Sequence, residues 1–293
     1  MDSIYDSLLV DFSTALNEWT FSIFSKVVRM FIRILFVTQG FYRVNYDARN
    51  WALLTNYLNS ESFTNIHVLN RAQLLDDAFN LARAGVMNYG TALSLTKYLS
   101  RETDYIPWYS ALTGFNYLDR RIRGMSEYDH HTFKKYVLRL FETVNNTLGF
   151  EEQETDSHTT KINRNLIMSW LCNYEVKSCT DYAKREFAAL MNDPDSYYIS
   201  PNLKSVVYCN GLRFGGEEEW DFLWNRYLNH NVNTEQVIIL GVLGCTKNET
   251  LAHRYLRTTI TADSGVRSQD YYRIYPSVYN NPYGVEHAIS FLE

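Results

Sequence analysis

The spacing of apolar side chains changes once near the start of the chain and then stays helical. Over residues 41–47, apolar side chains such as Tyr42 and Val44 alternate with polar ones such as Arg43, which is the two-residue period of a β-strand. From Asn50 onward the apolar positions recur every three or four residues, and no second strand pattern follows. The sequence therefore predicts one short strand followed by a mostly α-helical chain.

The best-defined helix is expected between Asn70 and Gly85. Asn70 is a residue type that caps helices, and Gln73 completes the spacing of a capping box. A wide apolar face that includes Phe79 follows, and Gly85 suits the left-handed conformation that ends many helices. We therefore expect Phe79 to be a core anchor.

Short amphipathic segments fill the remainder of the chain. Pro107 fits the first turn of a helix that ends at Gly124, and Ser126 can cap the next helix, which ends at Gly149. The polar residues 151–160 form the clearest exposed linker. Further helices are expected near residues 91–100, 161–174, 180–192, 203–214, 217–229, 234–243, 248–260, 266–275 and 284–293.

Consecutive short helices must each bury an apolar face against a neighbour. Such a chain forms either an irregular bundle or a solenoid of helix pairs. No exact repeat occurs at the periods that mark tetratricopeptide or armadillo arrays. If the helices pair, their pairing is therefore a feature of the structure without a matching repeat in the sequence.

The charge balance argues against nucleic acid as a partner. The chain has 28 Lys and Arg against 33 Asp and Glu, a formal net charge of −5 at pH 7. Binding to a phosphate backbone requires an excess of positive charge. We therefore expect no nucleic-acid partner.

The N-terminal residues do not identify a compartment. Met1–Asp11 contains three Asp and no basic residue, unlike the start of a secretory signal peptide. Phe21–Thr38 is the most apolar run, but Lys26, Arg29 and Arg33 interrupt it, and each central charge costs roughly 2.5–3.5 kcal/mol on insertion into a membrane. We therefore expect no transmembrane helix here, and interpret the run as an amphipathic surface helix or a loosely packed extension.

No local motif names a reaction. The seven histidines include no His-Glu-x-x-His pattern, and the adjacent pair His130–His131 would diverge on a helix. Glu217–Glu219 are expected to open a helix, where the helix dipole favours negative charge. The arginines within residues 120–123 are interpreted as a solvated helix end, and Asp76–Asp77 as a solvated or inter-helix face. No catalytic or metal-binding residue is predicted.

The cysteines and two asparagines bear on the compartment of the protein. The four cysteines are either buried free thiols or two disulfides of an exported protein. They are Cys172, Cys179, Cys209 and Cys245. Asn145 and Asn248 begin Asn-x-Thr sequons and are candidate glycosylation sites.

Several separated segments closely resemble the zinc aminopeptidases of the aminopeptidase N and endoplasmic-reticulum aminopeptidase type. The resemblance begins with Gly40–Asp47 and Asn70–Gly85 and covers about residues 34–292. It continues in the same order through Tyr98-Leu99, Glu102, Tyr105, Pro107-Trp108, Cys172, Cys179, Pro201–Leu203, Val207–Cys209, Trp220–Leu223, Leu243–Thr246 and Gln269-Asp270. So many motifs in one order make the resemblance specific.

The resemblance implies an order of domains. Residues 34–48 would be a remnant of the family's β-sandwich domain. Residues 49–293 would be its C-terminal helical domain, an α-solenoid of antiparallel HEAT- or armadillo-like helix pairs that is incomplete at its C-terminus. Residues 1–33 match nothing in the family and form an unassigned N-terminal extension. Within the helical part, Trp108 and Trp220 are expected to be core anchors.

The resemblance also pairs the cysteines. It implies the disulfides Cys172–Cys179 and Cys209–Cys245. These imply a secretory route or the extracellular face of the plasma membrane, although no signal peptide or transmembrane helix is evident in the sequence.

The resemblance implies a peptidase family but not a complete peptidase. The family's zinc-binding His-Glu-x-x-His helix, its Gly-x-Met-Glu-Asn loop and its transition-state-stabilising tyrosine belong to an upstream domain that has no counterpart in these residues. We therefore expect that this chain binds no zinc and hydrolyses no peptide alone, and that zinc is the cofactor of the complete enzyme.

The expected role is that of a non-catalytic C-terminal domain, which encloses the peptide cavity and packs on the catalytic domain. The expected partners are a peptide substrate, that catalytic domain and a second copy of the chain in a homodimer. The alternative is an independent helical module that binds a peptide or a protein without enzymatic activity.

Overall fold

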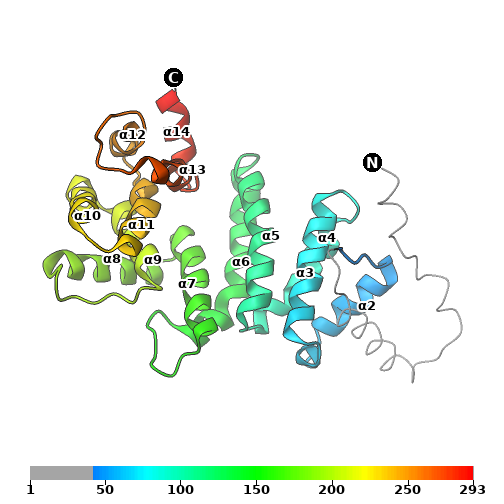
Figure 1. The fold of residues 1–293 in the computed structure, drawn as a ribbon. Helices are drawn as coiled ribbons and strands as arrows, with labels where there is room; N and C mark the ends of the chain where they lie inside the picture. The colour runs from blue at the N-terminus through cyan, green and yellow to red at the C-terminus, as the bar shows by residue number, and fades with distance from the viewer. Residues whose placement is uncertain (1–41, 293) are drawn as a thin grey trace, which may run out of the picture. The chain divides into compact units, whose positions relative to one another are not determined.

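A computed structural model describes residues 42–292 of the chain. Every regular element in this range is a helix, which confirms the mostly α-helical class. The helices form two compact units that meet in sequence between Leu148 and Gly149 and are coloured along the chain in Figure 1. The arrangement of the helices as a solenoid stays a prediction.

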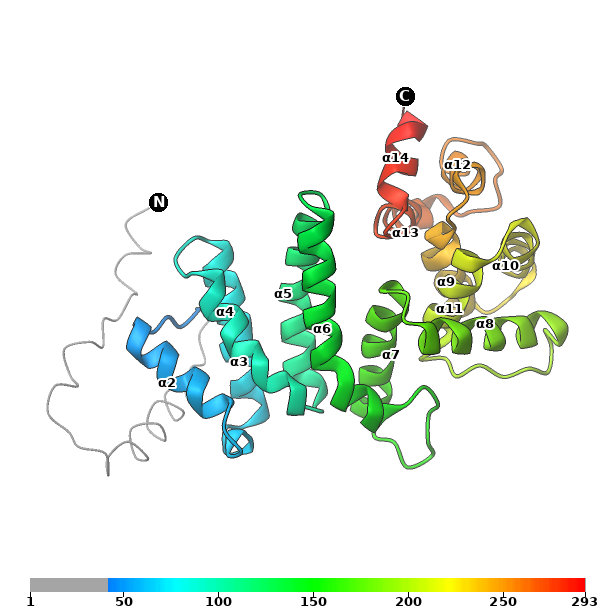
Figure 2. The ribbon, with the colours of Figure 1, turned by 180° about the vertical axis from the view of Figure 1, so that it is seen from behind.

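The first unit consists of four longer helices and several short ones. In order, these are α2 (Ala48–Leu58), η2 (Phe63–Asn65), α3 (Val68–Arg83), α4 (Tyr89–Leu95), η3 (Thr96–Arg101), α5 (Tyr105–Arg123) and α6 (Glu127–Leu148). Helices α5 and α6 form an antiparallel hairpin (Figures 1 and 2), and α3 packs along α5.

The core of the first unit is aromatic. Phe79 of α3 lies edge-on to Phe115 of α5, with ring centroids 5.5 Å apart. Trp108 of α5 is 0% exposed and contacts Phe141 of α6 at 5.2 Å between centroids. Gly114 lets α3 approach α5, because a Cβ at this position would lie 2.3 Å from Cγ of Phe79. The apolar faces expected from the sequence therefore meet in one core.

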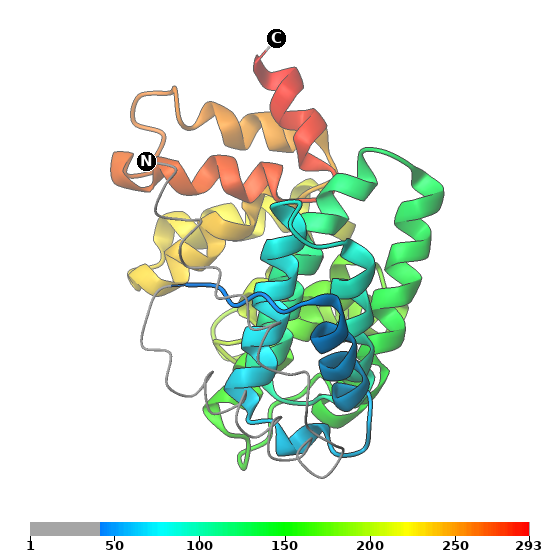
Figure 3. The same cartoon turned by 90° about the vertical axis from the view of Figure 1, so that its right-hand side faces the viewer.

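The second unit is built from shorter helices. These are α7 (His158–Asn173), α8 (Lys177–Asn192), α9 (Lys204–Phe214), α10 (Glu217–Asn229), α11 (Asn233–Val242), η4 (Leu243–Cys245), α12 (Glu249–Arg257), η5 (Ser268–Arg273), α13 (Ile274–Tyr279) and α14 (Gly284–Leu292). Helix α13 lies between α11 and α12, as Figure 3 shows in yellow, red-orange and orange.

The core of the second unit repeats the glycine contact of the first. Gly211 of α9 faces Phe187 of α8, and an added Cβ would lie 2.3 Å from Cγ of that ring. Trp220 of α10 is 1% exposed, and its indole N–H donates to the carbonyl of Leu243 at 3.1 Å. The indole N–H of Trp220 thus has a partner while its ring fills the core.

Several expected helix boundaries are confirmed. The Ser126 hydroxyl accepts a hydrogen bond from the backbone N–H of Asp129 at 3.2 Å, so it caps α6. Gly85 follows α3 with φ of +76°, and Gly149 follows α6 with φ of +60°, the left-handed conformation that glycine adopts without strain. Pro107 lies in the first turn of α5, as expected.

Two sequence predictions are wrong. Residues 42–47 form no strand, because a strand needs a neighbouring strand to bond to, and none is present within residues 42–292. Asn70 does not cap α3. The helix begins earlier, at Val68, and the Nδ1 atom of His67 accepts the bond from the N–H of Leu69 at 3.3 Å. Asn70 instead lies buried inside the helix.

Other predictions fall outside the described residues. These include the unassigned extension over residues 1–33 and the apolar run at residues 21–38. Within residues 42–292, no helix is both long and apolar enough to cross a membrane.

Candidate functional site

The first residues that the structure describes are attached to α3 by a pair of carboxylates. The Arg43 guanidinium contacts Asp76 at 2.5 Å and Asp77 at 3.4 Å. The backbone N–H of Val44 donates to the second oxygen of Asp77 at 3.2 Å. Asp77 is 1% exposed. Burial raises its pKa, and hydrogen bonds from Gln73 and Val44 oppose that rise. The start of the described chain is thus attached to α3 by the ion pair of Arg43 and by the hydrogen bond from Val44 to the buried Asp77 carboxylate.

The same segment is also held by aromatic contacts at the start of α2. The indole N–H of Trp51 donates to the side-chain oxygen of Asn45 at 3.0 Å. Tyr46 lies edge-on to Trp51, with ring centroids 5.0 Å apart, and burial raises the pKa of the Tyr46 hydroxyl. Asp47 then caps α2 by accepting from the N–H of Asn50 at 2.7 Å. Residues 43–47 are therefore fixed against two helices.

A buried ion pair joins α3 to the turn between η3 and α5. The Nε of Arg71 lies 2.7 Å from Oε2 of Glu102, and both side chains are at most 5% exposed. A second guanidinium nitrogen lies 3.2 Å from the other Glu102 oxygen and 3.0 Å from Asp104. The third nitrogen donates to the carbonyl of Ile66 at 2.6 Å. Such a pair is tolerated inside a protein because its hydrogen-bonding groups are paired.

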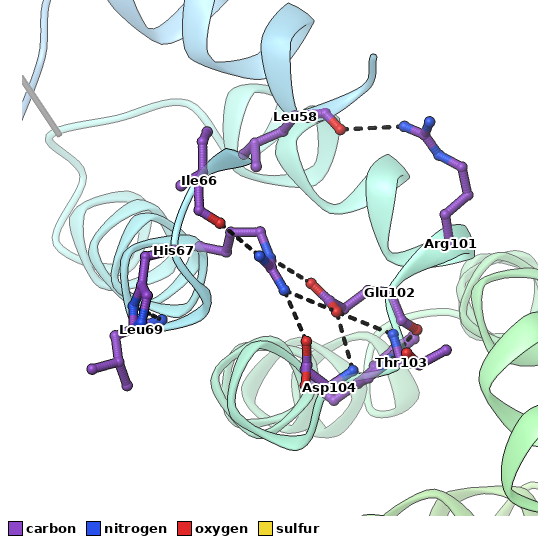
Figure 4. A network of polar contacts seen from close by, with 10 residues as sticks. Leu58, Ile66, His67, Leu69, Arg101, Glu102, Thr103 and Asp104 are labelled. Atoms are coloured by element: carbon purple, nitrogen blue, oxygen red, sulfur yellow. Dashed lines mark hydrogen bonds and ion pairs between the residues drawn. The ribbon is translucent and has the colours of Figure 1, made fainter. Parts of the chain in front are cut away.

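Figure 4 shows how this ion pair fixes the turn. The backbone N–H groups of Thr103 and Asp104 donate to one Glu102 oxygen at 3.1 and 3.0 Å. The indole N–H of Trp108 donates to the Glu102 carbonyl at 2.9 Å. Glu102 therefore positions the beginning of α5 through its side chain and its backbone.

In the second unit, Glu235 of α11 collects three donors. Lys204 lies 2.6 Å, the Tyr208 hydroxyl 2.7 Å and Nε of Arg226 3.2 Å from its carboxylate. Burial raises the pKa of Glu235, but the hydrogen bonds from Lys204 and Tyr208 outweigh it and hold the pKa below its ordinary value. Helices α9, α10 and α11 therefore meet at one charged carboxylate.

Two disulfides lie within the second unit. Cys172–Cys179 closes the turn between α7 and α8, with Cα atoms 5.3 Å apart, and Cys209–Cys245 joins α9 to η4 at 5.2 Å. These are the pairs that the resemblance implies. The buried Arg213 connects them, because its guanidinium lies 3.4 Å from the Cys172 carbonyl and 3.4 Å from Sγ of Cys209.

Comparison with known proteins identifies the family of this helical chain. The sequence model described as the ERAP1-like C-terminal domain matches residues 37–293. The chain belongs to the ERAP1-like C-terminal domain family. A membrane alanyl aminopeptidase of Manduca sexta is 37% identical over 265 residues, which cover 90% of this chain and 25% of the relative.

Two further relatives of the ERAP1-like chain support this assignment. The aminopeptidase N of Plutella xylostella is 38% identical over 86% of this chain and 26% of the relative. The aminopeptidase N of Mus musculus is 33% identical over 88% of this chain and 26% of the relative. The chain thus spans about a quarter of the length of the curated relatives that it matches.

The histidines of the ERAP1-like chain take part in separate contacts. The His130 ring lies 2.9 Å from Asp119, which also binds Arg123 at 2.7 Å. His253 lies 3.0 Å from the Ser290 hydroxyl. Within residues 42–292, no group of three or more His, Cys, Asp or Glu side chains is placed to hold a metal ion.

The glycosylation candidates differ in their surroundings. Asn248 is exposed and caps α12, since its Oδ1 accepts from the N–H of Leu251 at 3.3 Å. Asn145 lies half-buried within α6. Glycosylation at either residue stays a prediction.

Sequence reasoning missed the long-range partners of the charged residues. The sequence shows Asp76–Asp77 as a dense pair of carboxylates, but their partner Arg43 lies 33 residues from Asp76. Arg71 was not singled out, and its partner Glu102 lies 31 residues away. Local spacing carries no signal for such pairs, although Glu102 occurs among the residues of the family resemblance. Glu217–Glu219 do open α10, as expected.

Proposed function

We propose that this chain forms the C-terminal helical domain of a zinc-dependent aminopeptidase, in which it packs on the catalytic domain and helps to enclose the peptide substrate. Membership of the ERAP1-like family supports the proposal, as do relatives that are named aminopeptidases and are about four times as long. Zinc would be bound by the catalytic domain, where the resemblance places the family's zinc-binding motif.

The observation that carries the proposal is the attachment of residues 43–47 to α2 and α3. Arg43, Val44 and Asn45 each bond to a side chain of these helices. A flexible connection would let a helical domain drift relative to its neighbour, whereas a bonded connection holds it in one orientation. Such an attachment suits a domain that must stay beside a catalytic domain while it covers a substrate.

The two disulfides support a location outside the cytosol. Disulfides persist in secreted and cell-surface proteins and are reduced in the cytosol. One relative is named a membrane alanyl aminopeptidase. We propose that the complete protein follows the secretory route or is exposed on the extracellular face of the plasma membrane.

A chimera tests the proposed role. The Manduca sexta relative is expressed intact, without the region that matches this chain, and with that region replaced by residues 37–293 of this chain. Deletion is expected to lower kcat/KM for a decapeptide at least tenfold, and replacement to restore most of it, because enclosure acts on the positioning of the substrate. The isolated chain with zinc is the parallel sample and is expected to give no turnover of an aminoacyl chromogenic substrate.

Three results would contradict the proposal. A deletion that leaves hydrolysis of the decapeptide unchanged would remove the enclosing role. A folded chimera that stays as inactive as the deletion would show that this chain cannot serve as the domain. Turnover by the isolated chain, abolished by a chelator, would show that the chain is itself a peptidase.

A further inference from the structure

The turn between α7 and α8 contains a residue in an uncommon backbone conformation. Glu175 has a φ of +56°, in the left-handed region that residues with a side chain rarely adopt. It directly follows Tyr174 at the end of α7, a position where glycine is the usual residue. The Cys172–Cys179 disulfide closes this turn. A glutamate held where glycine fits without strain indicates that its side chain has a role there.

The Glu175 carboxylate binds two side chains from distant parts of the second unit. Nζ of Lys247 lies 2.8 Å from Oε1 of Glu175, and the Tyr283 hydroxyl donates to the same oxygen at 2.7 Å. These partners lie 72 and 108 residues away in the sequence. Burial lowers the pKa of Lys247, but its hydrogen bonds to Glu175 and Tyr283 outweigh this effect and raise the pKa. Lys247 is therefore charged at neutral pH.

Lys247 also contacts the helix that carries the other disulfide. Its ammonium lies 4.7 Å from the ring centroid of Phe214, the last residue of α9, and 4.6 Å from that of Tyr283. A cation is attracted to the face of an aromatic ring. Lys247 follows Cys245 by two residues, and Cys245 is bonded to Cys209 of α9. Lys247 therefore connects the turn between α7 and α8 to the two elements that this disulfide joins.

Arg213 of α9 forms a second connection between the disulfides. Its side chain is buried, and its guanidinium donates to Oδ1 of Asn173 at 2.8 Å and to the Cys172 carbonyl at 3.4 Å. The same guanidinium lies 3.4 Å from Sγ of Cys209. A thiolate formed at Cys209 would attract this guanidinium. The contacts of Arg213 with the end of α7 would then weaken.

We propose that the two disulfides of the second unit form one coupled redox lock, in which opening either bond makes the other easier to reduce. Opening Cys172–Cys179 frees the strained turn, so that Glu175 can leave Lys247. Opening Cys209–Cys245 frees α9 from η4, which loosens the contacts of Lys247 and draws Arg213 toward the new thiolate. Coupling between two equilibria is reciprocal, so each bond affects the other equally. The lock is independent of the proposed aminopeptidase role.

Each bond opens by exchange with a dithiol. One thiolate of the dithiol attacks a sulfur of the protein disulfide, and the other cysteine leaves as a thiolate that takes up a proton. The second thiolate of the reagent then attacks its own sulfur in the mixed disulfide and displaces the remaining cysteine, which is also protonated. The dithiol leaves as a cyclic disulfide. Two electrons and two protons thus pass from the dithiol to each protein bond.

The test measures the four redox states of the full chain at equilibrium in mixtures of reduced and oxidised dithiothreitol. After alkylation, intact mass gives the number of open bonds and peptide mass spectrometry identifies them. The coupling constant is the fraction with both bonds closed times the fraction with both open, divided by the product of the two singly open fractions. We expect about 10 or more in the native chain. In concentrated urea, where the connecting contacts are lost, we expect about 1.

Substitutions test the connection through Lys247. Lys247→Met and Glu175→Gln are each expected to lower the coupling constant about threefold or more. The double variant should lower it no further, because both changes remove the same contact. Lys177→Met is the matched control, since Lys177 lies two residues before Cys179 but is exposed and pairs with Asp181; it should leave the constant unchanged. Circular dichroism melting shows that each variant is folded.

The proposal is overturned by any of three outcomes. A coupling constant of about 1 in the native chain would show that the bonds open independently. A smaller constant would show that opening one bond protects the other. A large constant that folded Lys247→Met and Glu175→Gln variants retain would show that these side chains do not connect the disulfides. None of these readings depends on peptidase activity, so the lock and the aminopeptidase role can fail separately.

Discussion

At the scale of single residues, a glycine and a phenylalanine lie in close contact in each of the two units. Gly114 and Phe79 join α3 to α5, and Gly211 and Phe187 join α8 to α9, with the ring lying where a side chain would begin. The sequence predicts the burial of Phe79 from its helical face. It does not predict Gly114 as its partner, because a lone glycine inside a helix has no local signature for close packing.

The contact between Phe79 and Gly114 predicts that the effect of Gly114→Ala on the free energy of unfolding depends on the residue at position 79. Gly114→Ala alone should destabilise the protein by roughly 1–3 kcal/mol, because the new methyl overlaps the ring. Phe79→Ala alone should cost roughly 3–5 kcal/mol. In the Phe79→Ala background, Gly114→Ala should become neutral or stabilise by up to about 1 kcal/mol, because alanine is the better helix former.

Urea unfolding of the four proteins measures this coupling. If Gly114→Ala costs the same in both backgrounds, the ring and the glycine do not contact one another. A loss below about 1 kcal/mol for Phe79→Ala would show that the helix face is assigned wrongly.

Glu235 predicts a dependence of stability on pH. Its pKa in the folded protein lies below the ordinary value of 4.5, so between these two values the unfolded chain binds more protons. The contribution of Glu235 to stability is therefore complete above about pH 4.5 and is lost as the pH falls through the folded pKa. At pH 7, Glu235→Gln should cost roughly 1.5–3 kcal/mol, because it removes the charge that the half-buried Lys204 and Arg226 bind.

The free energy of unfolding of the Glu235→Gln variant should be compared with that of the unaltered chain at pH 7, 5 and 3. The difference between the two should shrink toward the lowest pH. Glu142→Gln, at an exposed position of α6, is the control and should show no such convergence. A difference that is constant or grows with acidity would contradict the assignment.

At the scale of elements, local signals predicted most helices, but they failed for the segment at residues 42–47 and for the start of α3. Ser126, Gly85 and Gly149 are close to the helix ends that they define, so their sequence patterns sufficed. The segment at residues 42–47 has the alternation of a strand but lies against helices, because strand formation depends on a neighbour. The beginning of α3 was misplaced because histidine is an uncommon cap, although His67 performs that role here.

The two disulfides are predicted to differ in their response to a reductant. Cys172 and Cys179 are both 0% exposed, whereas Cys209 is partly exposed and a guanidinium nitrogen of Arg213 lies 3.4 Å from its sulfur. Access controls thiol exchange, and a nearby positive charge stabilises the thiolate that reduction releases. Cys209–Cys245 should therefore be reduced first.

Titration with dithiothreitol, alkylation and peptide mass spectrometry would follow the two bonds separately. In the native protein, modified Cys209 and Cys245 should appear at least tenfold faster than modified Cys172 and Cys179. In concentrated urea the two bonds should be reduced at similar rates, which shows that the difference belongs to the fold. Earlier reduction of Cys172–Cys179 in the native protein would refute the prediction.

At the scale of the whole molecule, the polar stretch at residues 151–160 predicts an exposed linker but no division of the helical chain into units. The two compact units divide close to this stretch, between Leu148 and Gly149. The candidate site was less accessible to prediction. Arg71 and Glu102 lie 31 residues apart in the sequence, and only the folding of the first unit brings their side chains together.

The close contact of a glycine and a ring in each unit has a consequence for mutational tolerance. A helix spacing that leaves no room for one methyl group permits a single residue type at its narrowest point. If every amino acid were tried at every position and the folded survivors were sequenced, positions 114 and 211 would retain almost nothing but their native residue. Nearby exposed positions, such as Thr113 and Asn116, would accept many replacements.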